Sequence, residues 1–258
     1  MLDVREIQSF YPAYLRGFKK NLLREYLQYK ILEIIFDSEF GEKLAFMGGT
    51  AIHIVHSSVR FSEDLDFDNI DLTKKEFGVL IELIQRKLNG EGYNVEYKNV
   101  FSGAYHAYLK FTNILFENKL SGHRQEKLLI QIDMEPQRFK YQPQKALINK
   151  FDVFLRINAV SADILLAQKI VCIFRRKRTM GRDFYDAVFL MGRTKPHFGY
   201  LCQKLKIKDA RDLKYKLSKA CEKLDFKKLA ADVEPFLFDS KDAKKVRFFA
   251  EYIKEEEF

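Results

Sequence analysis

Two aspartates that follow a glycine turn, in an otherwise apolar stretch, constrain this chain more than any other feature. The segments are FMGGT at residues 46–50 and RFSEDLDF at residues 60–67. In a β-strand, side chains alternate between faces, so Asp64 and Asp66 would share one face while Leu65 and Phe67 enter the core. Two neighbouring anions need a cation, and Mg²⁺ binds carboxylate and phosphate oxygens. The pattern therefore predicts a site for Mg²⁺ and a nucleotide, with Mn²⁺ as an alternative ion. A solvated edge strand, with further acids nearby, is the competing interpretation.

The glycine turn is expected to join a short strand at 43–47 to a helix at 50–56. Glycine lets the backbone approach a ligand closely, and the first N–H groups of a helix can bind phosphate oxygens. Gly48, Gly49 and Thr50 are therefore candidate nucleotide-binding residues. Their spacing matches neither the P-loop nor the dinucleotide-binding glycine pattern. By itself, this turn is more typical of an ordinary tight connection without any ligand.

Two further residues stand out by their apolar surroundings. Asp133 is the single acid of an apolar strand at 128–134, which suits a third metal ligand and a general base; a carboxylate at a strand end is the alternative. Lys169 lies in a helix that is otherwise apolar nearly all round, so its ammonium must reach water or an anion such as a triphosphate. Asp183 and Asp186 share one helical face and could hold Lys169 or Arg182 in position.

The pattern of apolar residues divides the chain near residue 158. A long amphipathic helix is predicted at 14–37, followed by strands and helices in the order β-α-β-α up to residue 88. Strands at 93–97, 107–111 and 128–134 predict a mixed sheet. Helices are predicted at 162–177, 182–192, 209–223 and 241–256. We therefore expect an α+β fold, with an α/β domain at 1–158 and a helical domain at 159–258.

The amino-acid composition indicates which class of partner the protein binds and where in the cell it is located. The 45 Lys and Arg residues outnumber the 36 Asp and Glu residues, which gives a net charge of +9 and favours a polyanionic partner such as RNA or DNA. A lysine-rich proteome would produce the same excess. The three cysteines have neither disulfide nor zinc spacing. No apolar run is long enough to span a bilayer, so we expect a cytoplasmic protein without membrane contact.

Several motifs in order resemble a known family. They are Gly48-Gly49, Arg60, Ser62, Asp64-Leu65-Asp66, Lys169 and Arg182-Asp183-x-x-Asp186. In this order they resemble the AbiEii-type nucleotidyltransferase toxins of abortive-infection toxin–antitoxin systems. The resemblance implies a polymerase-β-like nucleotidyltransferase core that carries a C-terminal helical bundle domain. It makes Asp64 and Asp66 the Mg²⁺ ligands. It also places other residues in the nucleotide pocket, namely Arg60, Ser62, Lys169, Arg182 and Asp183.

The function expected from these patterns is transfer of a nucleoside monophosphate from an NTP to an acceptor hydroxyl. The resemblance implies an RNA acceptor, tRNA-like in kind, and a cognate antitoxin. One alternative keeps the chemistry but takes a protein or a small molecule as acceptor. Another is a nucleotide- or RNA-binding module without turnover, which is suggested by Val59 and Gly49, where the family commonly has histidine and serine.

Overall fold

The computed structural model describes residues 2–258, and residue contacts divide the chain into two units. The first unit comprises the residues up to Val55 and Phe61–Ala159. The second comprises His56–Arg60 and Val160–Phe258. The short segment 56–60 therefore leaves the first unit between the glycine turn and the aspartate strand, and returns to it at Phe61.

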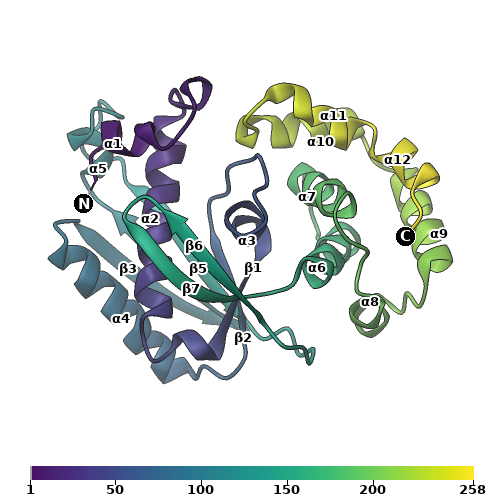
Figure 1. The fold of residues 1–258 in the computed structure, drawn as a ribbon, viewed down its shortest axis with the longest axis horizontal. Helices are drawn as coiled ribbons and strands as arrows, with labels where there is room; N and C mark the ends of the chain where they lie inside the picture. The colour runs from purple at the N-terminus through teal and green to yellow at the C-terminus, as the bar shows by residue number, and fades with distance from the viewer. Residues whose placement is uncertain (1) are drawn as a thin grey trace. The chain divides into compact units, whose positions relative to one another are not determined.

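The first unit is built on a mixed sheet of seven strands among the described residues (Figure 1). The strands are β1 Leu44–Met47, β2 Leu65–Asn69, β3 Val95–Ser102, β4 Ala104–Phe111, β5 Leu128–Glu135, β6 Gln144–Lys150 and β7 Val153–Ala159. Their order is β3-β4-β5-β2-β1-β7-β6. β1 pairs with β7, and β2 with β5, in parallel, while the other pairs are antiparallel. The predicted mixed sheet is confirmed.

The helices of this unit are α1 Val4–Ser9, α2 Lys19–Phe36, α3 Gly48–Ile54, α4 Lys74–Gly90 and α5 Ile114–Glu117. The predicted order β-α-β-α is confirmed by β1, α3, β2 and α4. The amphipathic helix predicted at 14–37 is wrong in two respects. A short 3₁₀ turn and Gly17 precede α2, because glycine is a poor helix former. From Leu22 to Ile35, α2 is buried on nearly every side rather than along one stripe.

One face of the sheet is covered by α2 and α4. Phe36 of α2 contacts Phe67 of β2 with ring centroids 6.2 Å apart. Phe77 of α4 contacts Tyr105 of β4 at 5.5 Å. Leu65 and Phe67 are fully buried, as predicted, so strand alternation turns Asp66 toward the opposite face. The aspartates thus avoid the apolar layer between sheet and helices.

The hairpin of β6 and β7 is fixed by a cluster of aromatic rings around Phe151, which has a positive φ of 60°. The rings in contact with it are Phe10, Tyr11, Tyr26 and Tyr29. The neighbouring Lys150 ammonium lies 4.1 Å from the centroid of Tyr11 and 2.6 Å from Glu25 Oε1. The other oxygen of Glu25 lies 3.0 Å from His53 Nε2 on α3. A buried carboxylate of α2 therefore joins the hairpin to the helix that follows the glycine turn.

This carboxylate should make stability depend on pH below about 4.5. Burial raises the pKa of Glu25, but the charges and hydrogen bonds of His53 and Lys150 outweigh burial and lower that pKa from 4.5 to about 2. A lowered carboxyl pKa adds stability above the unfolded pKa, and this contribution is lost as the pH falls toward the folded pKa. We expect the stability difference between the wild type and Glu25→Gln to be about 2 kcal/mol smaller at pH 3 than at pH 6. Urea unfolding at both pH values measures it, and an equal difference at both would contradict it.

The second unit is helical from residue 162 onward (Figure 1). Its helices are α6 Ala162–Arg175, α7 Gly181–Met191, α8 Phe198–Leu205, α9 Ala210–Cys221, α10 Phe226–Val233, α11 Lys244–Arg247 and α12 Phe249–Glu255. The helices predicted near 162, 182 and 209 are confirmed, whereas α8 and α10 were not expected. The single helix predicted at 241–256 is wrong, because the chain forms a 3₁₀ turn and then two short helices that meet at Phe248.

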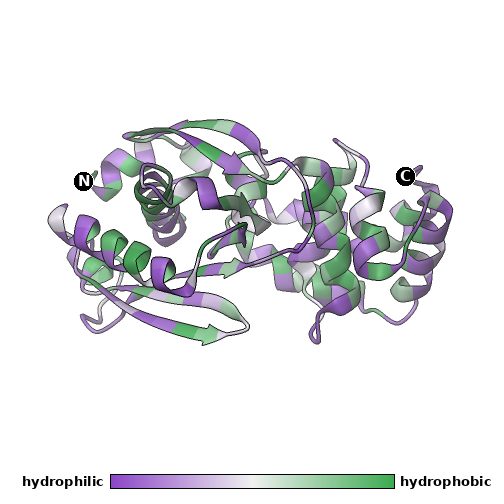
Figure 2. Cartoon of the chain, turned by 90° about the horizontal axis from the view of Figure 1, so that it is seen from below, coloured by the Kyte–Doolittle hydropathy of each residue, from purple (hydrophilic) through white to green (hydrophobic). Residues whose placement is uncertain are grey.

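Hydrophilic and hydrophobic residues are interleaved along the helices and strands of both units (Figure 2). Within the described chain, no helix combines the length and apolar character that crossing a bilayer requires.

Candidate functional site

Two of the predicted carboxylates, Asp66 and Asp133, lie on neighbouring strands of the sheet in the first unit. β2 and β5 are parallel neighbours, and Asp66 is the direct register partner of Asp133. Because partners in register project to the same face, these two carboxylates stand side by side. Asp64 precedes β2 by one residue and is half-buried, as is Asp66. The structure therefore places Asp66 and Asp133 side by side, with Asp64 two residues before Asp66.

The glycine turn lies directly against Asp66. Met47, the last residue of β1, pairs with Asp66, and α3 begins at the next residue. Gly48 has a φ of +76°, and a Cβ atom built there would lie 2.1 Å from Asp66 Oδ2. Such a distance is far below van der Waals contact, so only glycine fits. Thr50 Oγ1 donates a hydrogen bond to the backbone carbonyl of Asp64. The turn thus shapes the position of both aspartates.

Two residues that the sequence patterns did not single out hold Asp133. His106 Nδ1 lies 2.6 Å from Asp133 Oδ1, and Gln131 Nε2 lies 2.8 and 2.9 Å from the two carboxylate oxygens. An ionised carboxylate only accepts hydrogen bonds, so both neighbours donate to it. The sequence signal was available but weak: His106 and Gln131 occupy polar positions that alternate with apolar ones in β4 and β5.

The donor set at this face suits a hard divalent cation. Asp64, Asp66 and Asp133 offer carboxylate oxygens, which Mg²⁺ prefers. Among residues 2–258, no group of three or more His, Cys, Asp or Glu side chains is arranged to enclose an ion. Mg²⁺ is commonly held by one or two carboxylates together with substrate phosphates and water, so a complete protein cage is not required. The residues present therefore fit the predicted ion, and its binding stays a prediction.

The second unit contains the other predicted residues in a buried network of charges. Arg60 Nε and one terminal nitrogen each lie 2.6 Å from an oxygen of Asp186. Lys169 Nζ lies 2.9 Å from Asp186 Oδ2 and 3.3 Å from Asp183 Oδ1. Arg176 Nε lies 2.9 Å from Asp183 Oδ2. Arg60, Lys169 and both aspartates are nearly inaccessible to solvent. The two aspartates thus hold Lys169, as their spacing predicts.

Opposite charges dominate the ionisation of this network. Burial by itself lowers the pKa of Lys169, but Asp186 and Asp183 outweigh it and raise that pKa. Burial by itself raises the pKa of Asp186, but the positive charges of Arg60 and Lys169 outweigh burial and lower that pKa. Lys169 and Asp186 therefore stay charged at neutral pH, and each depends on its partners for compensation.

The remaining residues predicted for the nucleotide pocket are Arg182 and Ser62. Arg182 is half-buried on α7 next to Asp183. Ser62, in the first unit, accepts a hydrogen bond at its carbonyl oxygen from Gln28 Nε2 at 3.1 Å. Their assignment to a nucleotide pocket stays a prediction.

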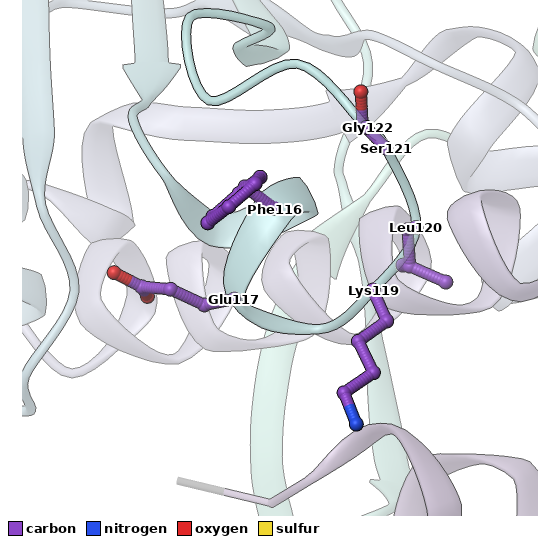
Figure 3. A pocket seen from close by; sticks show the side chains of 6 residues that line it. All are labelled: Phe116, Glu117, Lys119, Leu120, Ser121 and Gly122. Carbon is purple, nitrogen blue, oxygen red and sulfur yellow. The ribbon is translucent and has the colours of Figure 1, made fainter.

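A surface hollow of about 640 Å³ lies in the segment that joins β4 to β5 (Figure 3). Its lining includes Phe116 and Leu120. Phe111 pairs with Leu128 at this end of β5, whereas His106 pairs with Asp133 toward the other end. The hollow is therefore separated from the carboxylates by most of the length of β5.

Comparison with known proteins gives a family and two solved structures with a similar fold. A model of the family described as nucleotidyl transferase AbiEii toxin, type IV TA system, matches residues 30–256. JHP933 from Helicobacter pylori has a similar solved structure, with a TM-score of 0.54 and 17% identity over 91% of this chain and 92% of that one. A structure solved as a candidate nucleotidyltransferase from H. pylori gives a TM-score of 0.53 and 18% identity over 92% and 98%. No curated protein matches the chain.

At these identities the two solved structures demonstrate a shared fold. The family match carries the assignment, because it spans most of the chain, including the glycine turn, both aspartates of β2 and the buried charges of the second unit. The protein therefore belongs to the AbiEii family of nucleotidyl transferase toxins, of type IV toxin–antitoxin systems.

Proposed function

We propose that this protein transfers a nucleoside monophosphate from an NTP to an acceptor hydroxyl on RNA, tRNA-like in kind, with Mg²⁺ or Mn²⁺ as the ion. The observation that carries the proposal is the register pairing of Asp66 with Asp133 beside a turn in which only glycine fits at position 48. Family membership supports nucleotidyl transfer as the reaction class. The net charge of +9 supports a polyanionic acceptor.

In the proposed reaction, the acceptor oxygen forms a bond to the α-phosphorus and the bond to the bridging oxygen breaks, so pyrophosphate leaves. Asp133 would take the proton of the acceptor hydroxyl. A divalent ion held by Asp64, Asp66 and Asp133 would neutralise the charge on the transferring phosphoryl group. The backbone N–H groups of the turn at Gly48 and Thr50 would donate to the phosphates of the NTP.

The function is tested by incubating the full chain with labelled NTPs, Mg²⁺ and total RNA. Wild type is expected to give labelled RNA, whereas Asp66→Ala is expected to give none above background, because the variant lacks a ligand on the reacting face. Labelled protein or small molecules instead of RNA would keep the chemistry and change the acceptor. Equally little product from wild type and variant, across several acceptors, would refute the enzymatic proposal.

His106 is expected to position Asp133 rather than to react. Replacing His106 with alanine should lower the transfer rate by roughly 10- to 100-fold, the usual cost of losing a neighbour that orients a metal-site ligand. His106→Asn should recover much of the rate, because its amide nitrogen can donate from a position similar to that of Nδ1. In both variants, the free energy of unfolding measured in urea should stay near the wild-type value. The affinity for RNA should also stay near that of wild type. Equal rates in all three proteins would contradict the positioning role.

One partner and one location accompany the proposal. Membership of a toxin–antitoxin family supports a cognate antitoxin, and we propose that the protein acts in the cytoplasm, where NTPs and RNA are present. Expression in a host with and without the neighbouring gene of the toxin–antitoxin pair tests the first statement. Equal growth in the two cases would contradict it.

A further inference from the structure

A second cavity of the first unit lies beside the row of aspartates. It has a volume of about 650 Å³ and is formed by the end of β2 and the loop that joins β5 to β6. The lining residues are Asp68, Asn69, Ile70, Pro136, Arg138, Phe139, Lys140, Tyr141 and Pro143. Asp68 follows Asp66 by two residues on the same strand, so both project to the same face, about 7 Å apart along β2.

The loop at 136–143 is anchored to the strand by this buried aspartate. Asp68 is 4% exposed. Its Oδ1 accepts a hydrogen bond from the backbone N–H of Gln137 at 2.8 Å, and its Oδ2 accepts one from the hydroxyl of Tyr141 at 2.8 Å. Prolines at both ends of the loop, Pro136 and Pro143, restrict its backbone further. The cavity wall is thus held in place without a ligand.

The side chains that the loop contributes suit a nucleotide. The rings of Phe139 and Tyr141 are nearly parallel, with an interplanar angle of 21° and centroids 6.4 Å apart. Arg138 and Lys140 alternate with them and are exposed. The only acid in the lining is Asp68, whose two oxygens already accept hydrogen bonds within the unit. Flat rings beside exposed cations are the combination that binds single-stranded nucleic acid, by base stacking and phosphate contacts.

The position of the cavity relative to the glycine turn favours the acceptor, rather than the NTP, as the molecule that it binds. Thr50 contacts Asp64, and Gly48 lies against Asp66, so the phosphate-binding turn is at the first part of the aspartate row. The cavity begins at Asp68, on the far side of Asp66 from Asp64. In phosphoryl transfer, the attacking and leaving oxygens lie roughly in line on opposite sides of the phosphorus. With the NTP phosphates on the turn, the acceptor would approach from the side of the cavity.

We infer that this cavity binds a nucleotide of a single-stranded RNA acceptor, with its base on Phe139 and Tyr141 and its phosphate near Arg138 and Lys140. The inference rests on the proposed function for the direction of approach. It deepens that function by placing the acceptor on the first unit.

The test is RNA binding by the full chain, measured by fluorescence anisotropy with a labelled single-stranded oligoribonucleotide of about ten nucleotides, within the usual site sizes of such proteins. Phe139→Ala is expected to weaken binding about tenfold, which corresponds to about 1.4 kcal/mol. The double variant Arg138→Gln, Lys140→Gln should reduce the salt slope of log affinity by about 1.4, because two phosphate contacts are lost. Phe116→Ala, an exposed phenylalanine in the hollow of Figure 3, is the matched control and should bind like wild type.

The outcomes separate this inference from the proposed function. If Phe139→Ala binds RNA like wild type while wild type still transfers nucleotides in an Asp66-dependent manner, the cavity is not the acceptor site and the function stands. If Phe139→Ala weakens binding of labelled NTPs with Mg²⁺ and leaves RNA binding intact, the cavity holds the NTP and the inference is overturned. If wild type gives no transfer but RNA binding falls as expected in the variants, the function fails and the RNA site stands. Tyr141→Phe keeps the ring but removes the hydroxyl that donates to Asp68 Oδ2, and it should retain most of the affinity because stacking supplies it.

Discussion

Replacing Gly48 with alanine is expected to lower nucleotidyl transfer by roughly 100- to 1000-fold. The added Cβ would lie 2.1 Å from Asp66 Oδ2, so either the carboxylate or the turn must move. A displacement of about 1 Å at a reacting centre can cost 100-fold in rate. The measurement is the yield of labelled product under conditions in which wild type is active, with circular dichroism to show that the variant is folded.

Gly103 provides a matched control for this substitution. It also has a positive φ, of 79°, but no atom lies within 4 Å of a Cβ built there. Gly103→Ala should therefore carry the backbone strain of the change, of order 1 kcal/mol, without contact with a carboxylate. It should keep near wild-type activity. A Gly48→Ala protein that is as active as Gly103→Ala would show that Asp66 is not set by the turn.

Replacing Asp186 with asparagine is expected to lower the free energy of unfolding by about 3–5 kcal/mol, the usual cost of removing one partner from a buried ion pair. Asp186 is fully buried and neutralises both Arg60 and Lys169. Without its charge, two cations remain in an apolar interior with Asp183 as the nearest acid. The bidentate contact also fixes the segment 56–60, because Arg60 is its last residue. Urea unfolding of the wild type and the variant measures the loss.

An exposed ion pair of the same unit is the appropriate control. Arg178 lies 3.4 Å from Asp232 and its side chain is 81% exposed. Arg178→Ala should change stability by less than about 1 kcal/mol. If Asp186→Asn is as stable as Arg178→Ala and instead loses affinity for NTPs, the buried charges bind the nucleotide. They would then not be needed to stabilise the fold.

The local part of the fold follows from the sequence. Alternation in β2 predicts that Leu65 and Phe67 enter the core, and both are fully buried. The helix α4 begins after Thr73, whose side chain and that of Glu76 cap each other's backbone N–H groups. Both features depend on residues a few positions apart, which is why periodicity and capping patterns reveal them. The burial of α2 on nearly all sides has no such signal, because a helix that is surrounded is recognised only from its neighbours.

The sequence was enough to predict which residue types form the candidate site. It was not enough to predict which of these residues contact one another. Asp66 and Asp133 could be chosen as acids on apolar strands, yet their pairing required β2 and β5 to be parallel neighbours in one register. The partner of Asp133 on β4, His106, follows from a second register that no short pattern encodes.

The sequence by itself determined which residues carry charge, which alternate in strands, and where glycine permits a left-handed turn. Only the tertiary structure decided that Arg60 meets Asp186 across 126 residues of chain, and that Asp68 anchors the loop beyond β5. The physical reason is the range of each effect. Backbone periodicity and capping act over a few residues, whereas strand register and buried ion pairs depend on which distant segments pack together, and that choice is made by the whole core at once.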